Sequence, residues 1–69
     1  MNYKIKKGEK IFSENKKDYI TITNREPGII YFTKNDDTEI NCFEFDENEF
    51  KCNYGDNYES VLYVMLQDQ

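Results

Sequence analysis

Hydrophobic and polar positions alternate most clearly in residues 38–53, which read TEINCFEFDENEFKCN. Phe43 and Phe45 alternate with acidic residues, and Phe50 and Cys52 form a second alternating pair. A period of two is typical of a strand with one buried face. The pattern therefore predicts a β-hairpin from Thr38 to Asn53 around which the rest of the chain is organised.

The register of this hairpin follows from pairing apolar groups with one another. A two-residue turn at Glu47 and Asn48 sets Phe45 opposite Phe50, and directly opposed residues of an antiparallel pair share a face. A shift by one residue would set Phe45 against a carboxylate, so the register is well specified. The side chains expected to be buried are Phe32, Phe43, Phe45 and Phe50.

Shorter alternating runs before the hairpin predict further strands. They cover residues 3–6, 10–13, 18–23 and 28–34. The last run is apolar on both faces, which is typical of a covered central strand. We expect the loop after it to have an odd number of residues, which would place Ile30 on the same face as Cys42. Asn35 or Asp36 should then adopt the left-handed conformation.

The C-terminal stretch fits two structures. Apolar residues at positions 58, 61, 62, 65 and 66 have the spacing of a helix face, whereas residues 60–66, apolar from Val61 onward, also have the length of a strand. We expect a mainly β fold, a small antiparallel barrel or curled sheet of SH3-like or OB-like size, with roughly five to seven strands. The alternative is an α+β fold in which a single C-terminal helix over residues 57–67 covers the sheet.

The length of the chain limits how much core it can build. Sixty-nine residues support a single domain, spanning 1–69. Six tyrosines and five phenylalanines must supply much of the core, because there is no tryptophan and only 38% of residues are apolar. A domain of this size is near the limit at which one core suffices, so oligomerisation would add useful stability.

Charge is distributed unevenly along the chain. Residues 1–34 carry eight basic and four acidic side chains, a formal charge of +4. Residues 35–69 carry one basic side chain, Lys51, and ten acidic ones, a formal charge of −9. Two interpretations follow: basic and acidic strands lie side by side and neutralise each other, or an acidic face is kept apart for a basic partner.

The residue types present exclude several kinds of chemistry. Without histidine, no Ser-His or Cys-His nucleophile pair exists. Cys42 and Cys52 lie ten residues apart with no second pair, which disfavours zinc, so we interpret both as core cysteines with free thiols. A glycosidase-like carboxylate pair at Glu44 and Glu49 is disfavoured because so small a chain offers little room for a substrate cleft. We expect no enzymatic activity, no cofactor and no bound metal.

Cellular location and nucleic-acid binding are judged from charge and hydropathy. No apolar segment follows the basic start of the chain, so no secretory signal pattern is visible and we expect a cytoplasmic protein without a membrane partner. Residues 3–19 mix lysines with aromatic side chains, as single-strand binders do. The sequence pI of about 4.6 nevertheless disfavours direct binding to nucleic acid.

These features favour a non-enzymatic, protein-binding module. In general profile the chain resembles small acidic inhibitors from phages and mobile elements, although no motif carries that resemblance. Such a protein would occupy a basic, nucleic-acid-binding surface of a partner, with carboxylates standing where phosphates lie. The candidate contacts are Asp36, Asp37, Glu39, Glu44, Asp46, Glu47 and Glu49, with Tyr54 and Tyr58 as anchors. The alternative is a small-ligand-binding or sequestering protein that acts as a homo-oligomer, and a third possibility is a structural or regulatory subunit.

Overall fold

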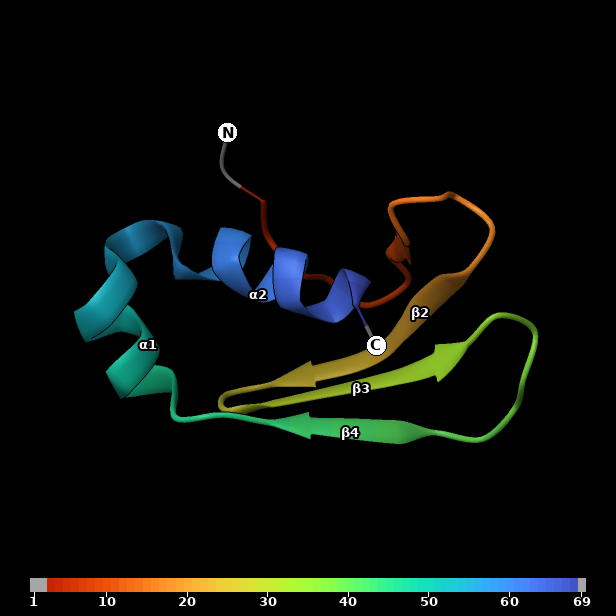
Figure 1. The fold of residues 1–69 in the computed structure, drawn as a ribbon. Helices are drawn as coiled ribbons and strands as arrows, with labels where there is room; N and C mark the ends of the chain where they lie inside the picture. The colour runs from red at the N-terminus through yellow and green to blue at the C-terminus, as the bar shows by residue number, and fades with distance from the viewer. Residues whose placement is uncertain (1–2, 69) are drawn as a thin grey trace.

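Figure 1 shows the computed structural model, which describes residues 3–68. The described chain forms an open sheet of four antiparallel strands in the order β1-β2-β3-β4, and its helices follow the last strand. The elements are β1 (Lys10–Phe12), β2 (Tyr19–Glu26), β3 (Ile29–Lys34), β4 (Asn41–Glu44), α1 (Glu47–Tyr54), the 3-10 helix η1 (Gly55–Asn57) and α2 (Tyr58–Gln67). This is the α+β alternative with a C-terminal helix, and the strands do not close into a barrel.

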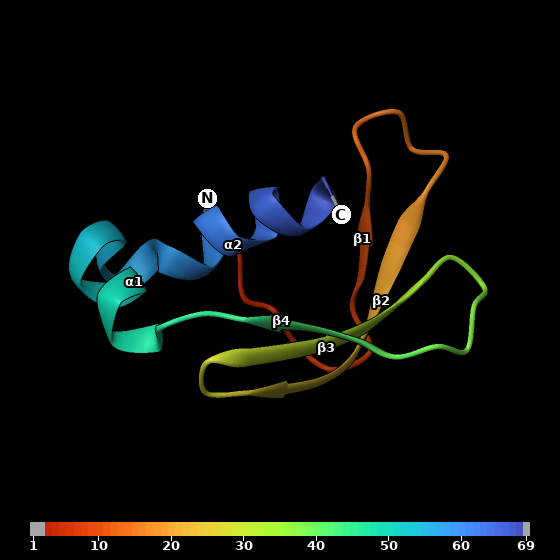
Figure 2. The ribbon, with the colours of Figure 1, turned by 60° about the horizontal axis from the view of Figure 1, so that its bottom comes forward.

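Helix α2 lies across one face of the sheet, over β1 and β2 (Figures 1 and 2). Leu62 and Leu66 are four residues apart, so they point the same way from the helix, and both are fully buried. Val64 points away from the sheet and is 59% exposed. The helical period of these residues therefore outweighs their strand propensity. The core consists of Ile5, Ile11, Ile20, Ile22, Ile30, Phe32, Leu62 and Leu66.

The predicted hairpin over residues 38–53 is wrong in its second half, which forms α1. The side chain of Asp46 caps this helix by accepting a hydrogen bond from the backbone N–H of Glu49, at 3.1 Å. Gly55 ends it with a φ of 72° and donates its N–H to the carbonyl of Lys51. Phe50 therefore contacts Tyr54, one helical turn later, with ring centroids 5.4 Å apart.

The register between β3 and β4 also differs from the expected one. Ile30 pairs with Phe43 and Tyr31 pairs with Cys42, so Phe43 faces the helices and Cys42 faces away. The reason is the connecting loop, which spans residues 35–40 and has an even number of residues. Its first residue, Asn35, has the expected left-handed conformation, with a φ of 50°.

The outcome for the predicted core follows from this register. Phe32 is buried as predicted, whereas Phe43, Phe45 and Phe50 are half-buried and pack around the core. Cys42 and Cys52 are both free and both exposed, so the interpretation as core cysteines is wrong. Cys42 lies on the uncovered face of the sheet and Cys52 lies in α1.

The strand predicted over residues 3–6 does not form. This segment instead runs along α2, where the N–H of Ile5 donates to Oε2 of Glu59 at 2.9 Å. The Tyr3 ring stacks on Tyr63 with centroids 4.4 Å apart. Ile5 is thereby buried in the core.

Candidate functional site

Arg25 lies on the helix-covered side of the sheet because of a β-bulge between Ile22 and Asn24. Ile20 and Ile22 both face the core, and strict alternation would send Arg25 to the opposite face. The bulge shifts the alternation by one residue, so that Arg25 pairs with the buried Ile30. A charged side chain is thus directed underneath the helices.

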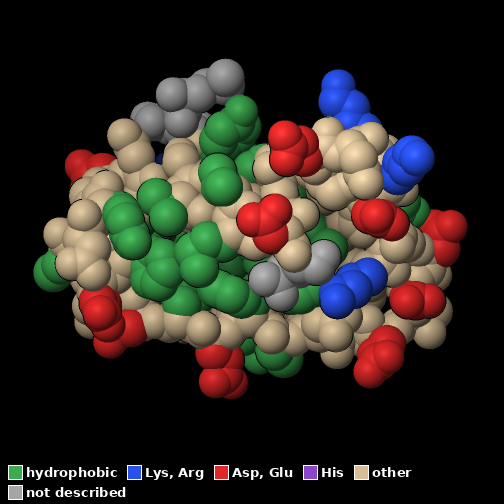
Figure 3. Space-filling view, in the orientation of Figure 1, with side chains coloured by type: hydrophobic (Ala, Val, Ile, Leu, Met, Phe, Trp, Pro, Cys, Tyr) green, Lys and Arg blue, Asp and Glu red, His purple; other side chains and the backbone are tan. Residues whose placement is uncertain are grey.

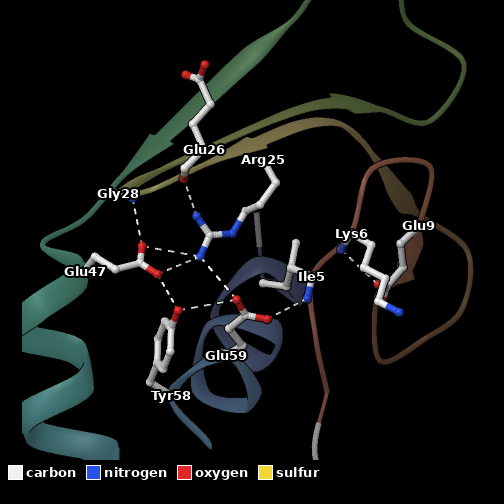
Figure 4. Close-up of polar contacts among 9 residues, drawn as sticks. All are labelled: Ile5, Lys6, Glu9, Arg25, Glu26, Gly28, Glu47, Tyr58 and Glu59. Carbon is white, nitrogen blue, oxygen red and sulfur yellow. Dashed lines mark hydrogen bonds and ion pairs between the residues drawn. The ribbon is translucent and has the colours of Figure 1, made fainter. Parts of the chain in front are cut away.

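Two carboxylates meet this guanidinium (Figure 4). Nη2 of Arg25 lies 3.1 Å from Oε1 of Glu47 and 3.3 Å from Oε1 of Glu59. The guanidinium carbon also lies 5.1 Å from the centroid of the Phe45 ring, within the range of a cation–π contact. The three charged side chains are between 14% and 19% exposed. Arg25 therefore ties β2 to both α-helices.

Glu47 accepts two further hydrogen bonds at this point. The N–H of Gly28 donates to Oε2 at 2.8 Å, and the hydroxyl of Tyr58 donates to Oε1. Burial opposes the ionisation of Glu47, but the bonds from Tyr58, Gly28 and Arg25 outweigh it and hold the pKa of this carboxyl below its ordinary value. Burial and the bond to Glu47 raise the pKa of Tyr58 to about 12. The carboxylate of Glu47 and the hydroxyl of Tyr58 therefore already have hydrogen-bond partners within the chain.

Sequence reasoning missed Arg25 and Glu59, which complete this cluster. The one signal available was that Arg25 is the only arginine in a chain whose other basic residues are lysines. Arginine is the residue preferred in buried ion pairs, because its planar fork of donors fits carboxylates. The contacts of this cluster are those of a structural clamp.

The remaining predicted acidic contacts lie around β4 and are all exposed. We call these six residues the acidic margin: Asp36, Asp37, Glu39, Glu44, Asp46 and Glu49. The loop before β4 carries the first three, β4 itself carries Glu44, and the cap and first turn of α1 carry the last two. No lysine or arginine occurs in residues 35–50. The six carboxylates therefore come from β4 and the segments directly before and after it, and Asp36 reaches back to Tyr19 of β2.

The two tyrosines predicted as anchors are separated by the fold. Tyr54 ends α1 and is half-exposed, whereas Tyr58 is turned inward to Glu47. Hydrophobic side chains gather in the angle between α1 and α2 (Figure 3). Met65 of α2 also exposes 38% of its surface. Apolar surface is therefore available on the helix side of the molecule.

One of several hollows in the surface bears on the small-ligand alternative. It has a volume of about 400 Å³ and lies between the end of α2 and the strands β1 and β2. Leu66 and Ile11 contribute apolar surface to it, and Asp18 and Lys34 contribute charges.

No protein-family model, curated protein or solved structure shows a significant match to this chain. Among residues 3–68, no helix is long and apolar enough to cross a membrane.

Proposed function

We propose that this protein is a non-enzymatic binding module that occupies a basic surface of a partner protein, of the kind that otherwise holds nucleic acid. The observation that carries this proposal is the order of the strands. Six of the nine basic residues lie between Lys4 and Lys17, on or near β1, and the acidic margin lies at the opposite edge around β4. Strands β2 and β3 separate β1 from β4, although Asp36 reaches back to Tyr19 of β2.

The interpretation in which acidic and basic strands neutralise each other has little support in the contacts. Among the described residues, ion pairs form only at Arg25, with Glu47 and Glu59. In the margin, Asp36 accepts a hydrogen bond from the hydroxyl of Tyr19, which is not a cation. Asp36 and Asp46 each accept a hydrogen bond within the chain, and none of the margin carboxylates forms an ion pair among the described residues, so they can still receive an external cation.

Asp46 caps α1, but the local backbone does not require the two carboxylates of the loop before β4, Asp36 and Asp37. Asn35 supplies the left-handed residue of the loop, so Asp36 and Asp37 are not needed for it. Like charges along one edge repel one another and cost some stability. A basic partner would remove that repulsion and would be attracted to the edge during diffusional encounter.

The test uses two variants with the same change in net charge. The margin variant carries Asp37→Asn, Glu39→Gln and Glu44→Gln, and the control variant carries Glu14→Gln, Asp56→Asn and Asp68→Asn, three exposed positions outside the margin. Proteins retained from a lysate by the immobilised wild type at low salt are purified, and their association rates are measured against increasing NaCl. For each purified partner that binds nucleic acid, we would also measure whether the wild-type protein displaces the nucleic acid.

The expected result is a slower association of the margin variant, by about tenfold, with a difference that shrinks at high salt as charges are screened. The control variant should associate almost as fast as the wild type. The proposal would be rejected if the association rate fell equally in the two variants, or if binding of the wild type did not depend on salt.

A further inference from the structure

The outer edge of β4 presents backbone groups that the sheet does not use. The N–H of Phe45 donates to the carbonyl of Gly28 at 2.9 Å, so Phe45 points toward β3. Backbone direction alternates along a strand, which means that Phe43 and Asn41 also point toward β3. The N–H and C=O groups of Cys42 and Glu44 therefore point outward. Within residues 3–68, no other strand pairs with this edge (Figure 1).

Of the features that usually protect an exposed strand, β4 has a short length of four residues and one charged side chain, Glu44. Lysines, prolines and bulges are further means of blocking an edge against another strand. β4 contains none of the three, whereas β1, at the other edge, is only three residues long and begins with Lys10. The difference points to an edge that is kept open for pairing.

The two faces along β4 specify different side chains. Phe43 faces the helices and is half-buried beside Phe45, with ring centroids 6.2 Å apart. Glu44 and Cys42 face the uncovered side. A strand added to this edge would alternate in the same way, with apolar residues beside Phe43 and basic residues beside Glu44 and the rest of the acidic margin.

We infer that β4 accepts a fifth strand, an extended segment of the partner protein in which basic and apolar residues alternate. This inference rests on the proposed function and specifies how the partner is held: backbone hydrogen bonds provide affinity and alternate side chains provide specificity. A second copy of the chain fits the edge less well. Pairing of β4 with itself would bring two acidic margins together on molecules that each carry a net charge of −5.

The probe is a short capped peptide in which lysine alternates with valine. Its control has the same composition arranged as Lys-Lys-Val-Val, which keeps the charge and removes the period of two. Binding to the intact protein is measured by titration calorimetry at low salt. The alternating peptide should bind at least about tenfold more tightly, since only it can present one apolar and one basic face to the edge.

A matched pair of variants tests the backbone contacts. Cys42→Pro removes an outward N–H while leaving the bonds to β3, and Cys42→Val keeps that N–H. Cys42→Pro should weaken the binding of the alternating peptide about tenfold, whereas Cys42→Val should leave the binding unchanged. Should Cys42→Pro unfold the chain, the same bonds can be tested on the wild type with two peptides, one methylated on the odd-numbered backbone nitrogens and one on the even-numbered ones. The peptide whose methyl groups replace the N–H groups that face β4 should bind about tenfold more weakly than the unmethylated peptide.

Three outcomes would overturn strand addition. The two peptides could bind equally, the proline and valine variants could bind alike, or the N-methylated peptides could match the parent. With any of these results, the comparison of margin and control variants would still decide the proposed function separately. A wild-type dimer in sedimentation that dissociates on Cys42→Pro would show that a second copy occupies the edge, and would also overturn the inference.

Discussion

At the scale of single residues, Glu47 shows how the fold uses one of its many carboxylates. It receives bonds from Arg25, Gly28 and Tyr58, which come from three different parts of the chain. Because its carboxyl joins a turn, a strand and two helices, Glu47 is required by the fold. The proposed partner contacts must therefore come from its exposed neighbours in the acidic margin.

The pH dependence of stability should report this role. Replacing Glu47 by glutamine should lower the free energy of unfolding by about 2 kcal/mol at neutral pH, because it removes the charge opposite Arg25. The pKa of Glu47 is lowered in the fold, so its contribution is present above the ordinary value of 4.5 and is lost as the pH falls through the lower folded value.

Urea unfolding of wild type and Glu47→Gln between about pH 3 and pH 7 measures this difference. The gap between the two proteins should narrow below about pH 4.5. Glu49→Gln, an exposed position in the same helix, is the control and should stay within about 0.5 kcal/mol of wild type at every pH. If the difference in unfolding free energy between wild type and Glu47→Gln stayed the same at every pH, the ionised carboxylate of Glu47 would not be the stabilising group.

At the scale of elements, α2 is the part of the structure whose packing can be tested most directly. Leu62 is fully buried on the sheet, so Leu62→Ala should cost about 3 kcal/mol, within the usual range for a buried leucine. Val64 is exposed two residues later, so Val64→Ala should change stability by less than about 0.5 kcal/mol. Thermal and urea unfolding measure both. Similar losses at the two positions would indicate that the segment does not pack as a helix.

The sequence predicted those elements whose pattern has only one interpretation. The strands around residues 18–23 and 28–34 form as expected because their apolar residues are β-branched or aromatic and continuous. Around Phe50 the alternation predicted a strand, but it is short, and the cap that Asp46 provides to the backbone N–H of Glu49 begins a helix there instead.

The Arg25 cluster could not be predicted by the same means. The bulge after Ile22 reverses the side on which Arg25 lies, and a bulge leaves little trace in a pattern of hydrophobic residues. Its second carboxylate, Glu59, lies 34 residues away in the chain. The edge position of β4 was likewise inaccessible, because it depends on the order of strands rather than on any segment alone.

At the scale of the whole molecule, the separation of charge between the two edges should affect stability. The margin variant should melt about 2–4 °C above wild type at low salt, because removal of three carboxylates relieves repulsion worth about 0.5 kcal/mol. Salt screens the same repulsion, so raising NaCl from about 0.05 to 0.5 M should narrow this difference. Differential scanning calorimetry measures both effects. A melting temperature below that of wild type would show that the margin carboxylates stabilise the fold.

The contact of Tyr3 and Ile5 with α2 has a consequence for how the chain acquires its structure during synthesis. Ile5 can make its bond to Glu59 only after a further 54 residues have been added, and the buried leucines of α2 come later still. Until then the strands made first lack their cover and expose isoleucines to water. The fold can therefore close only after α2 has left the ribosome, and until then local pairing of β2 with β3 is the structure available to the nascent chain.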